Sequence, residues 1–116
     1  LEKGDLAPVL DIERKPRGKA QLQADLVKFL NRLEQHYGVK PIIYTSYKYM
    51  TRYLDTPEFA QYPLWIAHYY VDTLSYEGAW QFWQHTDYGT VPGIDESVDL
   101  NVFNGSLDGL QRYTLK

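Results

Sequence analysis

Pro8-Val9-Leu10-Asp11-Ile12-Glu13 is the stretch on which the interpretation of the whole chain depends. It is a short apolar run with two acids one residue apart, which predicts a strand whose side chains alternate between two faces. Asp11 and Glu13 then share a face at the C-terminal end of a hydrophobic strand, where α/β barrels and open sheets collect their chemistry. The alternative is a solvated strand end whose acids pair with the basic loop Arg14-Lys15-Pro16-Arg17.

The composition predicts one globular domain. The chain has 116 residues, of which 44% are hydrophobic and 23% charged. No apolar run approaches the roughly 20 residues of a membrane span, and residues 1–5 do not resemble a signal peptide. Because the chain does not begin with Met, we expect a processed form or a piece of a longer protein. The absence of cysteine excludes disulfides and thiol catalysis, and a net charge of -3 argues against a nucleic-acid surface.

Aromatic residues make up an unusual 16% of the chain, with eleven Tyr and three Trp. Aromatic side chains fill cores, and Tyr and Trp also stack on sugar rings and line ligand clefts. Core packing accounts for about half of them, which leaves the rest available for such roles.

The hydrophobic pattern predicts the order β-α-β-α-β-β-β. Strands are expected at 8–13, 39–45, 64–69, 79–85 and 98–103, with a loop at 86–97 and a short helix or packed tail at 104–116. Helical spacing over 21–37 ends at Gly38, and shorter helices are expected at 47–54 and after Thr56-Pro57. The long helix should place one set of residues on the core: Leu22, Leu26, Phe29, Leu30, Leu33 and Tyr37.

The connections predict how the strands run. Strand, helix and strand follow one another with short links over 8–45, which predicts a parallel pair with a right-handed crossover. Only the short loop 71–78 separates the third and fourth strands, so no helix fits between them. If the last strand lies near the first, Asp11, Glu13 and Asp99 gather at one mouth.

Five motifs occur in an order and at a spacing that resemble glycoside hydrolase family 25, the Chalaropsis-type lysozymes, which are N-acetylmuramidases. They are Leu10-Asp11-Ile12-Glu13, Pro41-Ile42-Ile43-Tyr44-Thr45, Leu64-Trp65-Ile66-Ala67, Trp80-Gln81-Phe82-Trp83-Gln84 and Val98-Asp99-Leu100-Asn101. The resemblance implies an α/β fold in the form of an incomplete TIM-like (β/α) barrel. The chain would hold strands four to eight of the family barrel, and the last strands would have no helices between them. The family 18 chitinase motif D-x-x-D-x-D-x-E fits worse, because Leu6 and Val9 stand where two further Asp are required.

The resemblance also implies that residues 1–116 are the C-terminal portion of a catalytic domain. The family's first three strands are absent here, together with the Asp of its first strand. Five strands cannot close a barrel, and the first and last would present bare edges. We therefore expect a complementing N-terminal segment or second chain.

The resemblance implies that Glu13 is the general acid, with a pKa raised by Asp11 and by aromatic walls. Asp11 and Asp99 would stabilise positive charge or orient the substrate acetamido group. The candidate substrate-binding residues are Tyr44, Trp65, Tyr69, Trp83, Gln84 and Asn101. Of these, Asn101 fits better as a group that orients Asp99 or closes a turn than as a sugar contact. No cofactor or metal is expected, since a polar strand end accounts for His68, His85 and Asp87.

The predicted function is therefore that of a peptidoglycan muramidase, which hydrolyses the β-1,4 bond between N-acetylmuramic acid and N-acetylglucosamine. Its partners would be the glycan strands of the cell wall. It would act there as a secreted bacterial or phage lysin. Two alternatives remain open. One is a non-catalytic cell-wall carbohydrate-binding module. The other is a structural fragment that works only within a heteromeric assembly.

Overall fold

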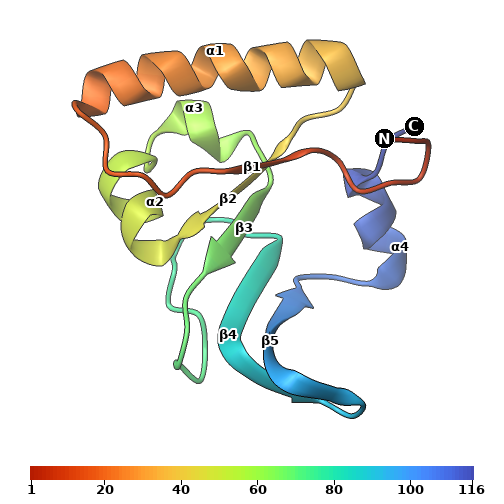
Figure 1. The fold of residues 1–116 in the computed structure, drawn as a ribbon. Helices are drawn as coiled ribbons and strands as arrows, with labels where there is room; N and C mark the ends of the chain where they lie inside the picture. The colour runs from red at the N-terminus through yellow and green to blue at the C-terminus, as the bar shows by residue number, and fades with distance from the viewer.

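The structure is a computed structural model that describes residues 1–116. Its five strands form one sheet in chain order, from β1 to β5 (Figure 1). The strands are β1 (Val9–Asp11), β2 (Ile42–Ser46), β3 (Leu64–Ala67), β4 (Phe82–Val91) and β5 (Ile94–Phe103). The helices are α1 (Lys19–Tyr37), α2 (Tyr47–Tyr53), α3 (Pro57–Ala60) and α4 (Leu107–Leu110), followed by the 3-10 helix η1 (Gln111–Tyr113). The predicted order of elements is confirmed.

The sheet is mixed and curled. Strands β1 to β4 are parallel, and β5 runs antiparallel to β4. The helix α1 connects β1 to β2, as the predicted crossover requires. Between β3 and β4 the chain returns to a parallel strand with no helix over residues 68–81. This architecture agrees with part of a barrel, and β1 and β5 remain at opposite edges of an open sheet.

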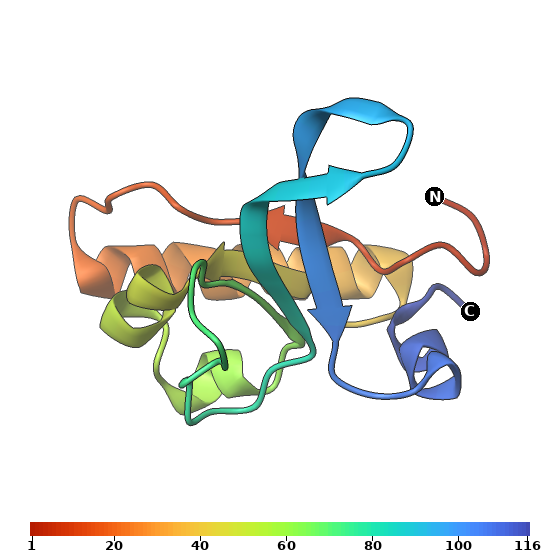
Figure 2. The same cartoon turned by 90° about the horizontal axis from the view of Figure 1, so that it is seen from below.

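The predicted loop over 86–97 is wrong. Strands β4 and β5 continue through this range as a long hairpin, which crosses in front of the sheet when the molecule is seen from below (Figure 2). The hairpin turns at Pro92-Gly93, where Gly93 has φ +91° and Val91 pairs with Ile94. Proline then glycine suits the two central positions of a type II turn. Its solvent-exposed strands carry polar residues, which gave this stretch a loop-like composition.

The long helix α1 begins two residues earlier than predicted and ends where predicted. Gly38 has φ +75°, and its N–H donates to the carbonyl of Glu34 at 2.8 Å, which closes the helix. Leu26 and Leu30 are buried against the sheet, as expected. Phe29 was predicted on the same face, but 47% of its surface is exposed. The buried stripe is therefore narrower than the spacing indicated.

The main core lies between the helices and one face of the sheet (Figure 1). Its members come from α1, β2, α2, α3, β3 and the residue that follows α2, and the most deeply buried are Leu30, Ile43, Leu54, Phe59 and Ile66. The opposite face carries a smaller apolar cluster around Ala7, Ile42 and Phe82, near the beginnings of the strands. The other end of that second face, where the parallel strands finish, carries polar and aromatic side chains.

The two ends of the chain lie side by side (Figure 1). Leu6 forms a β-bridge with Thr114, and the N–H of Ala7 donates to the carbonyl of Tyr113 at 2.7 Å. The predicted packed tail over 104–116 is thus a short helix and a segment that anchors the N-terminus. None of the helices is both long and apolar enough to cross a membrane.

Candidate active site

The site lies on the face of the sheet opposite α1, at the C-terminal ends of the parallel strands. Asp11 of β1 is in register with Tyr44 of β2, and Tyr44 is in register with Trp65 of β3. Side chains in register on neighbouring strands point to the same side of a sheet. The strand alternation read from the sequence therefore places an acid and two aromatic side chains together.

Glu13 lies two residues beyond the end of β1, which is shorter than predicted. Two hydrogen bonds fix the intervening residue: the N–H of Ile12 donates to the carbonyl of Tyr44 at 3.0 Å, and the hydroxyl of Thr45 donates to the carbonyl of Ile12 at 2.6 Å. Thr45 is completely buried, so this support belongs to the rigid part of the sheet. Tertiary packing, rather than strand pairing, positions Glu13.

The two acids interact with each other and not with the basic loop. The sole ion pair in the structure joins Lys40 to Glu34 at 3.4 Å, far along the chain from Asp11 and Glu13. The pairing of these acids with residues 14–17, which the sequence left open, is therefore not formed.

The pKa of Glu13 is raised above its ordinary value. Partial burial of the carboxyl is the largest cause, followed by a hydrogen bond with the side chain of Asp11 and by the negative charge of Asp11. Each of these effects favours the protonated form of Glu13. The direction agrees with the expected rise, and it makes Glu13 the candidate proton donor of the pair.

Gln84 of β4 joins the strands at the floor of the site. It is buried, with 5% of its surface exposed, and its Oε1 accepts hydrogen bonds from the hydroxyl of Tyr44 and, at 3.0 Å, from the hydroxyl of Tyr69. Burial, then Tyr69, then the charges of Glu13 and Asp11 raise the pKa of Tyr44. Tyr44 therefore lies within the electrostatic reach of both acids.

Replacing Gln84 by leucine is expected to destabilise the protein by about 1–3 kcal/mol, because it removes the acceptor for two partly buried hydroxyls while nearly keeping the volume. Urea unfolding followed by tryptophan fluorescence measures the change. Gln35→Leu, on the exposed side of α1, is the matched control and should shift stability by about 0.5 kcal/mol or less. Equal effects of the two substitutions would show that the hydrogen bonds accepted by Gln84 do not stabilise the fold.

Trp65 and Asn101 form a second polar contact on the same face. The indole N–H of Trp65 donates to Oδ1 of Asn101 at 2.8 Å. The ring of Trp65 is nearly perpendicular to that of Tyr44, with centroids 5.7 Å apart. Asn101 was expected to orient Asp99 or to close a turn, but it lies within β5, and the hydrogen bond that its side chain forms holds Trp65. Asn101 thus fixes the orientation of the Trp65 ring beside Tyr44 at the mouth of the site.

Asp99 lies on β5, across the site from Asp11 and Glu13. Burial raises the pKa of Tyr69, the neighbouring hydroxyl of Tyr44 opposes that rise, and the charges of Asp99, Asp87 and Glu13 add to it. The hydroxyl of Tyr69 therefore lies within the electrostatic reach of Asp99 and of Glu13. The expectation that Asp99 faces the same mouth agrees with this arrangement.

Trp83 is not brought together with the other predicted site residues. It is in register with Ile66, and both pack into the core on the helix side of the sheet. Its indole N–H donates to the carbonyl of His68 at 2.8 Å. Strand alternation separates Trp83 from Gln84, its neighbour in sequence. Its predicted contact with sugar remains untested.

Tyr70 was not identified from the sequence as a site residue. It has φ +62°, a conformation that is rare and costly for an aromatic residue. Its hydroxyl donates to Oδ1 of Asp87 on β4 at 2.5 Å, and this bond, burial and charge raise its pKa to about 12. The Tyr69-Tyr70 pair in the sequence gives no sign of the positive φ. Tyr70 extends the aromatic rim of the site beyond Tyr69.

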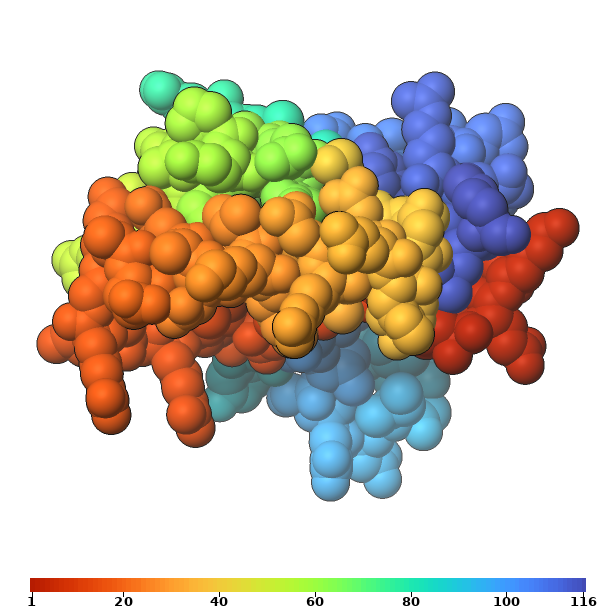
Figure 3. Space-filling view, turned by 90° about the horizontal axis from the view of Figure 1, so that it is seen from above, coloured from red at the N-terminus to blue at the C-terminus, as the bar shows by residue number.

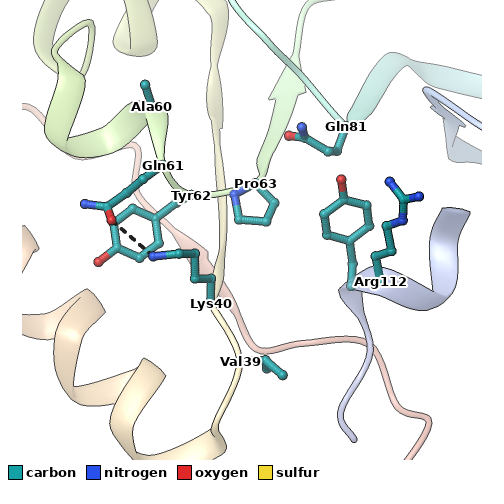
Figure 4. Close-up of a pocket in the computed structure, with 9 residues that line it drawn as sticks. Val39, Lys40, Ala60, Gln61, Tyr62, Pro63, Gln81 and Arg112 are labelled. Atoms are coloured by element: carbon teal, nitrogen blue, oxygen red, sulfur yellow. Dashed lines mark hydrogen bonds between the residues drawn. The ribbon is translucent and has the colours of Figure 1, made fainter.

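Two pockets lie at opposite ends of the strands. One of about 290 Å³ is bounded by Glu13, by Lys15 and by residues of α2. Another of about 390 Å³ is lined by residues that precede the strands, including Val39, Lys40, Pro63 and Gln81, together with Arg112 near the C-terminus (Figure 4). This second pocket contains no predicted site residue, so the chemistry of the acids belongs to the first end.

Comparisons with known proteins agree with this geometry. The family model of glycosyl hydrolases family 25 matches residues 1–94. The chain is 41% identical over 115 residues to the uncharacterized protein YegX of Escherichia coli (strain K12), covering 97% of this chain and 42% of YegX. It is 30% identical over 113 residues to Lysozyme M1 of Streptomyces globisporus, covering 87% of this chain and 38% of that protein.

The fold is similar to a solved structure of a family 25 glycosyl hydrolase from Bacillus anthracis. The TM-score is 0.80 at 30% sequence identity, and the match covers 95% of this chain and 55% of the other. This chain therefore spans less than half of the two sequence relatives and about half of the solved chain.

Proposed function

The chain belongs to glycosyl hydrolases family 25, and from this premise we propose that it carries much of the active site of a peptidoglycan muramidase. The reaction is hydrolysis of the β-1,4 bond between N-acetylmuramic acid and N-acetylglucosamine. One observation carries the proposal: Glu13, whose pKa is raised by burial and by Asp11, lies beside that second acid at the C-terminal edge of the sheet. Glycoside hydrolysis needs a protonated acid beside a group that stays negative.

In this mechanism Glu13 donates its proton to the oxygen of the leaving sugar. Asp11 remains ionised and stabilises the positive charge that develops on the other sugar, or orients its acetamido group. Asp99, on the far side of Tyr69, shares that role. The acetamido group of the substrate assists the displacement, so the products keep the configuration of the substrate.

The sugar rings contact the aromatic face next to the acids. Tyr44 and Trp65 are perpendicular to each other and are held by Gln84 and Asn101, so they present fixed surfaces for stacking. Tyr69, also bound to Gln84, extends this surface toward Asp99. Trp83 is left out of the proposed glycan contacts because it faces the core.

Residues 1–116 are proposed to be the C-terminal portion of the catalytic domain, with β1 to β5 equivalent to strands four to eight of the family barrel. The exposed edges of β1 and β5 then pair with strands supplied by another segment or chain. The proposed place of action is the bacterial cell wall, outside the cell or during lysis by a phage.

Clearing of a peptidoglycan suspension tests the proposal. The chain is assayed alone and after addition of a segment that supplies the family's first three strands. Clearing in either case supports a muramidase, and mass spectrometry should find N-acetylmuramic acid at the new reducing ends. Sugar binding without clearing in both cases would instead support a carbohydrate-binding module.

Asp11→Asn is expected to lower the pKa of Glu13, since the substitution removes the negative charge that favours the protonated carboxyl. A general acid is active below its pKa, so the alkaline limb of the pH–activity profile should move to lower pH. Carbon-13 NMR titration of the Glu13 carboxyl measures the shift without requiring activity. Asp99→Asn is the control, because Asp99 affects the pKa of Tyr69 and not that of Glu13. An unchanged Glu13 titration in Asp11→Asn would contradict the assigned coupling.

A further inference from the structure

The pocket next to Glu13 is surrounded by cations. Lys15 from the loop after β1, and Lys48 and Arg52 from α2, line it together with Glu13, which is the only acid in its wall. Side chains of the segment that leads into α1 project from the surface (Figure 3). A positive rim stands out in a chain whose net charge is -3.

These cations have no anionic partner within the protein. The ion pair of Lys40 with Glu34 is the only one formed, so Lys15, Lys48 and Arg52 lie beyond ion-pair distance of any carboxylate. Like charges gathered around one pocket repel one another and raise the free energy of the folded chain. An anionic ligand would remove this repulsion and would accept their hydrogen bonds.

Tyr49 forms part of the wall of this pocket and carries a polar group without a partner. It lines the same pocket, 6% of its surface is exposed, and its buried hydroxyl has no hydrogen-bond partner. A buried hydroxyl without a partner is costly, and native structures rarely leave one unexplained. The hydroxyl itself is covered by protein, so a ligand oxygen would become its partner only if the Tyr49 ring moved toward the pocket on binding.

We propose that this pocket binds a carboxylate of the acidic peptide stem attached to the glycan strand. The inference rests on the proposed function, because Glu13 belongs both to the pocket and to the reacting pair. The peptide stem is linked through the lactyl group of N-acetylmuramic acid, a sugar at the cleaved bond, so its carboxylates lie within reach of a pocket beside Glu13. The guanidinium of Arg52 can bind a carboxylate through two parallel hydrogen bonds, with Lys15 and Lys48 adding charge.

The test compares two soluble ligands by calorimetric titration of the 116-residue chain. Both are N-acetylglucosaminyl-N-acetylmuramoyl peptides, one with free peptide carboxylates and one with those carboxylates converted to amides. This disaccharide lacks the bond that the proposed reaction cuts, so binding is measured without turnover. We expect the acidic ligand to bind about tenfold or more tightly than the amidated one, as charge-assisted hydrogen bonds to at least one cation require.

The variant K15Q/K48Q/R52Q should abolish that preference and leave affinity for the amidated ligand unchanged. The control K3Q/K28Q/R32Q removes three positive charges from exposed positions outside this pocket and should keep the preference. Equal binding of the two ligands by the unmodified chain, or an undiminished preference in K15Q/K48Q/R52Q, would overturn the inference. In both cases binding of the amidated glycan would leave the proposed function standing.

If neither glycan binds, the proposed function fails. Titration with the free acidic peptide then tests whether the pocket binds a carboxylate. Peptide binding that is lost in K15Q/K48Q/R52Q supports a carboxylate site, and absence of peptide binding overturns it. Inorganic phosphate provides the last arm of the test. Phosphate bound as tightly as the acidic peptide would show a general anion site and overturn the assignment to a peptide stem.

Discussion

Replacing Glu13 by glutamine is expected to lower the rate of peptidoglycan hydrolysis by about 10²- to 10⁴-fold, which is the usual contribution of a general acid. The amide keeps the size of the side chain but has no acidic proton to give to the leaving sugar. The assay is initial-rate clearing of peptidoglycan, in whichever preparation is active: the chain alone, or the chain with the segment that completes the barrel.

Glu96→Gln is the matched control, because Glu96 is exposed on β5 beyond the site residues. It should retain the full rate. Circular dichroism should give an unfolding midpoint for Glu13→Gln no lower than that of the unmodified chain, since Glu13 forms no ion pair and the amide removes a charge that burial and Asp11 disfavour. Full turnover by Glu13→Gln would remove Glu13 from the mechanism and leave Asp11 or Asp99 as the candidate acid.

Replacing Leu30 by alanine is expected to cost about 2–5 kcal/mol of stability, because it opens a cavity in the core between α1 and the sheet. Leu30 is completely buried in the main cluster. A loss of this size is a large fraction of the 5–15 kcal/mol that typically stabilises a small domain. Urea unfolding should show a lower midpoint with an unchanged slope.

Phe29→Ala is the informative comparison, since it removes a larger side chain from the adjacent position of the same helix. With 47% of its surface exposed, Phe29 should contribute about 1 kcal/mol or less. A cost of Phe29→Ala equal to that of Leu30→Ala would mean that Phe29 is covered in solution, for example by the segment proposed to complete the barrel. The pair therefore also reports on what else packs against α1.

The pair Leu30 and Phe29 illustrates why periodicity predicts a helix better than it predicts its buried residues. Spacing of three and four residues places both on a broad apolar side of α1, and the helix itself is correctly predicted. Which of the two is buried depends on the height and direction of β2, α2 and α3 beneath the helix. Those elements come from distant parts of the chain, so no local pattern specifies their position.

The hairpin of β4 and β5 shows a second limit. Gly, Pro and Asp over 86–97 indicate a loop when each residue is considered alone. In the structure these strands pair mainly with each other and are exposed to solvent, so polar residues cost little there. Pro92-Gly93 was the local signal that could have identified the turn.

The sequence by itself determined the features that arise from neighbouring residues. These are the order of strands and helices, the helix end at Gly38, the crossover that makes β1 and β2 parallel, and the two acids one residue apart. Each depends on backbone preference or on alternation within one element. The family resemblance rests on the same local motifs.

Only the tertiary structure decided which of those residues meet. Gln84 receives the hydroxyls of Tyr44 and Tyr69 because three strands lie side by side, while Trp83, its neighbour, turns into the core. The cations beside Glu13 converge because α2 packs next to the end of β1. Such contacts join residues far apart in the chain, and their energies depend on burial that only the complete fold defines.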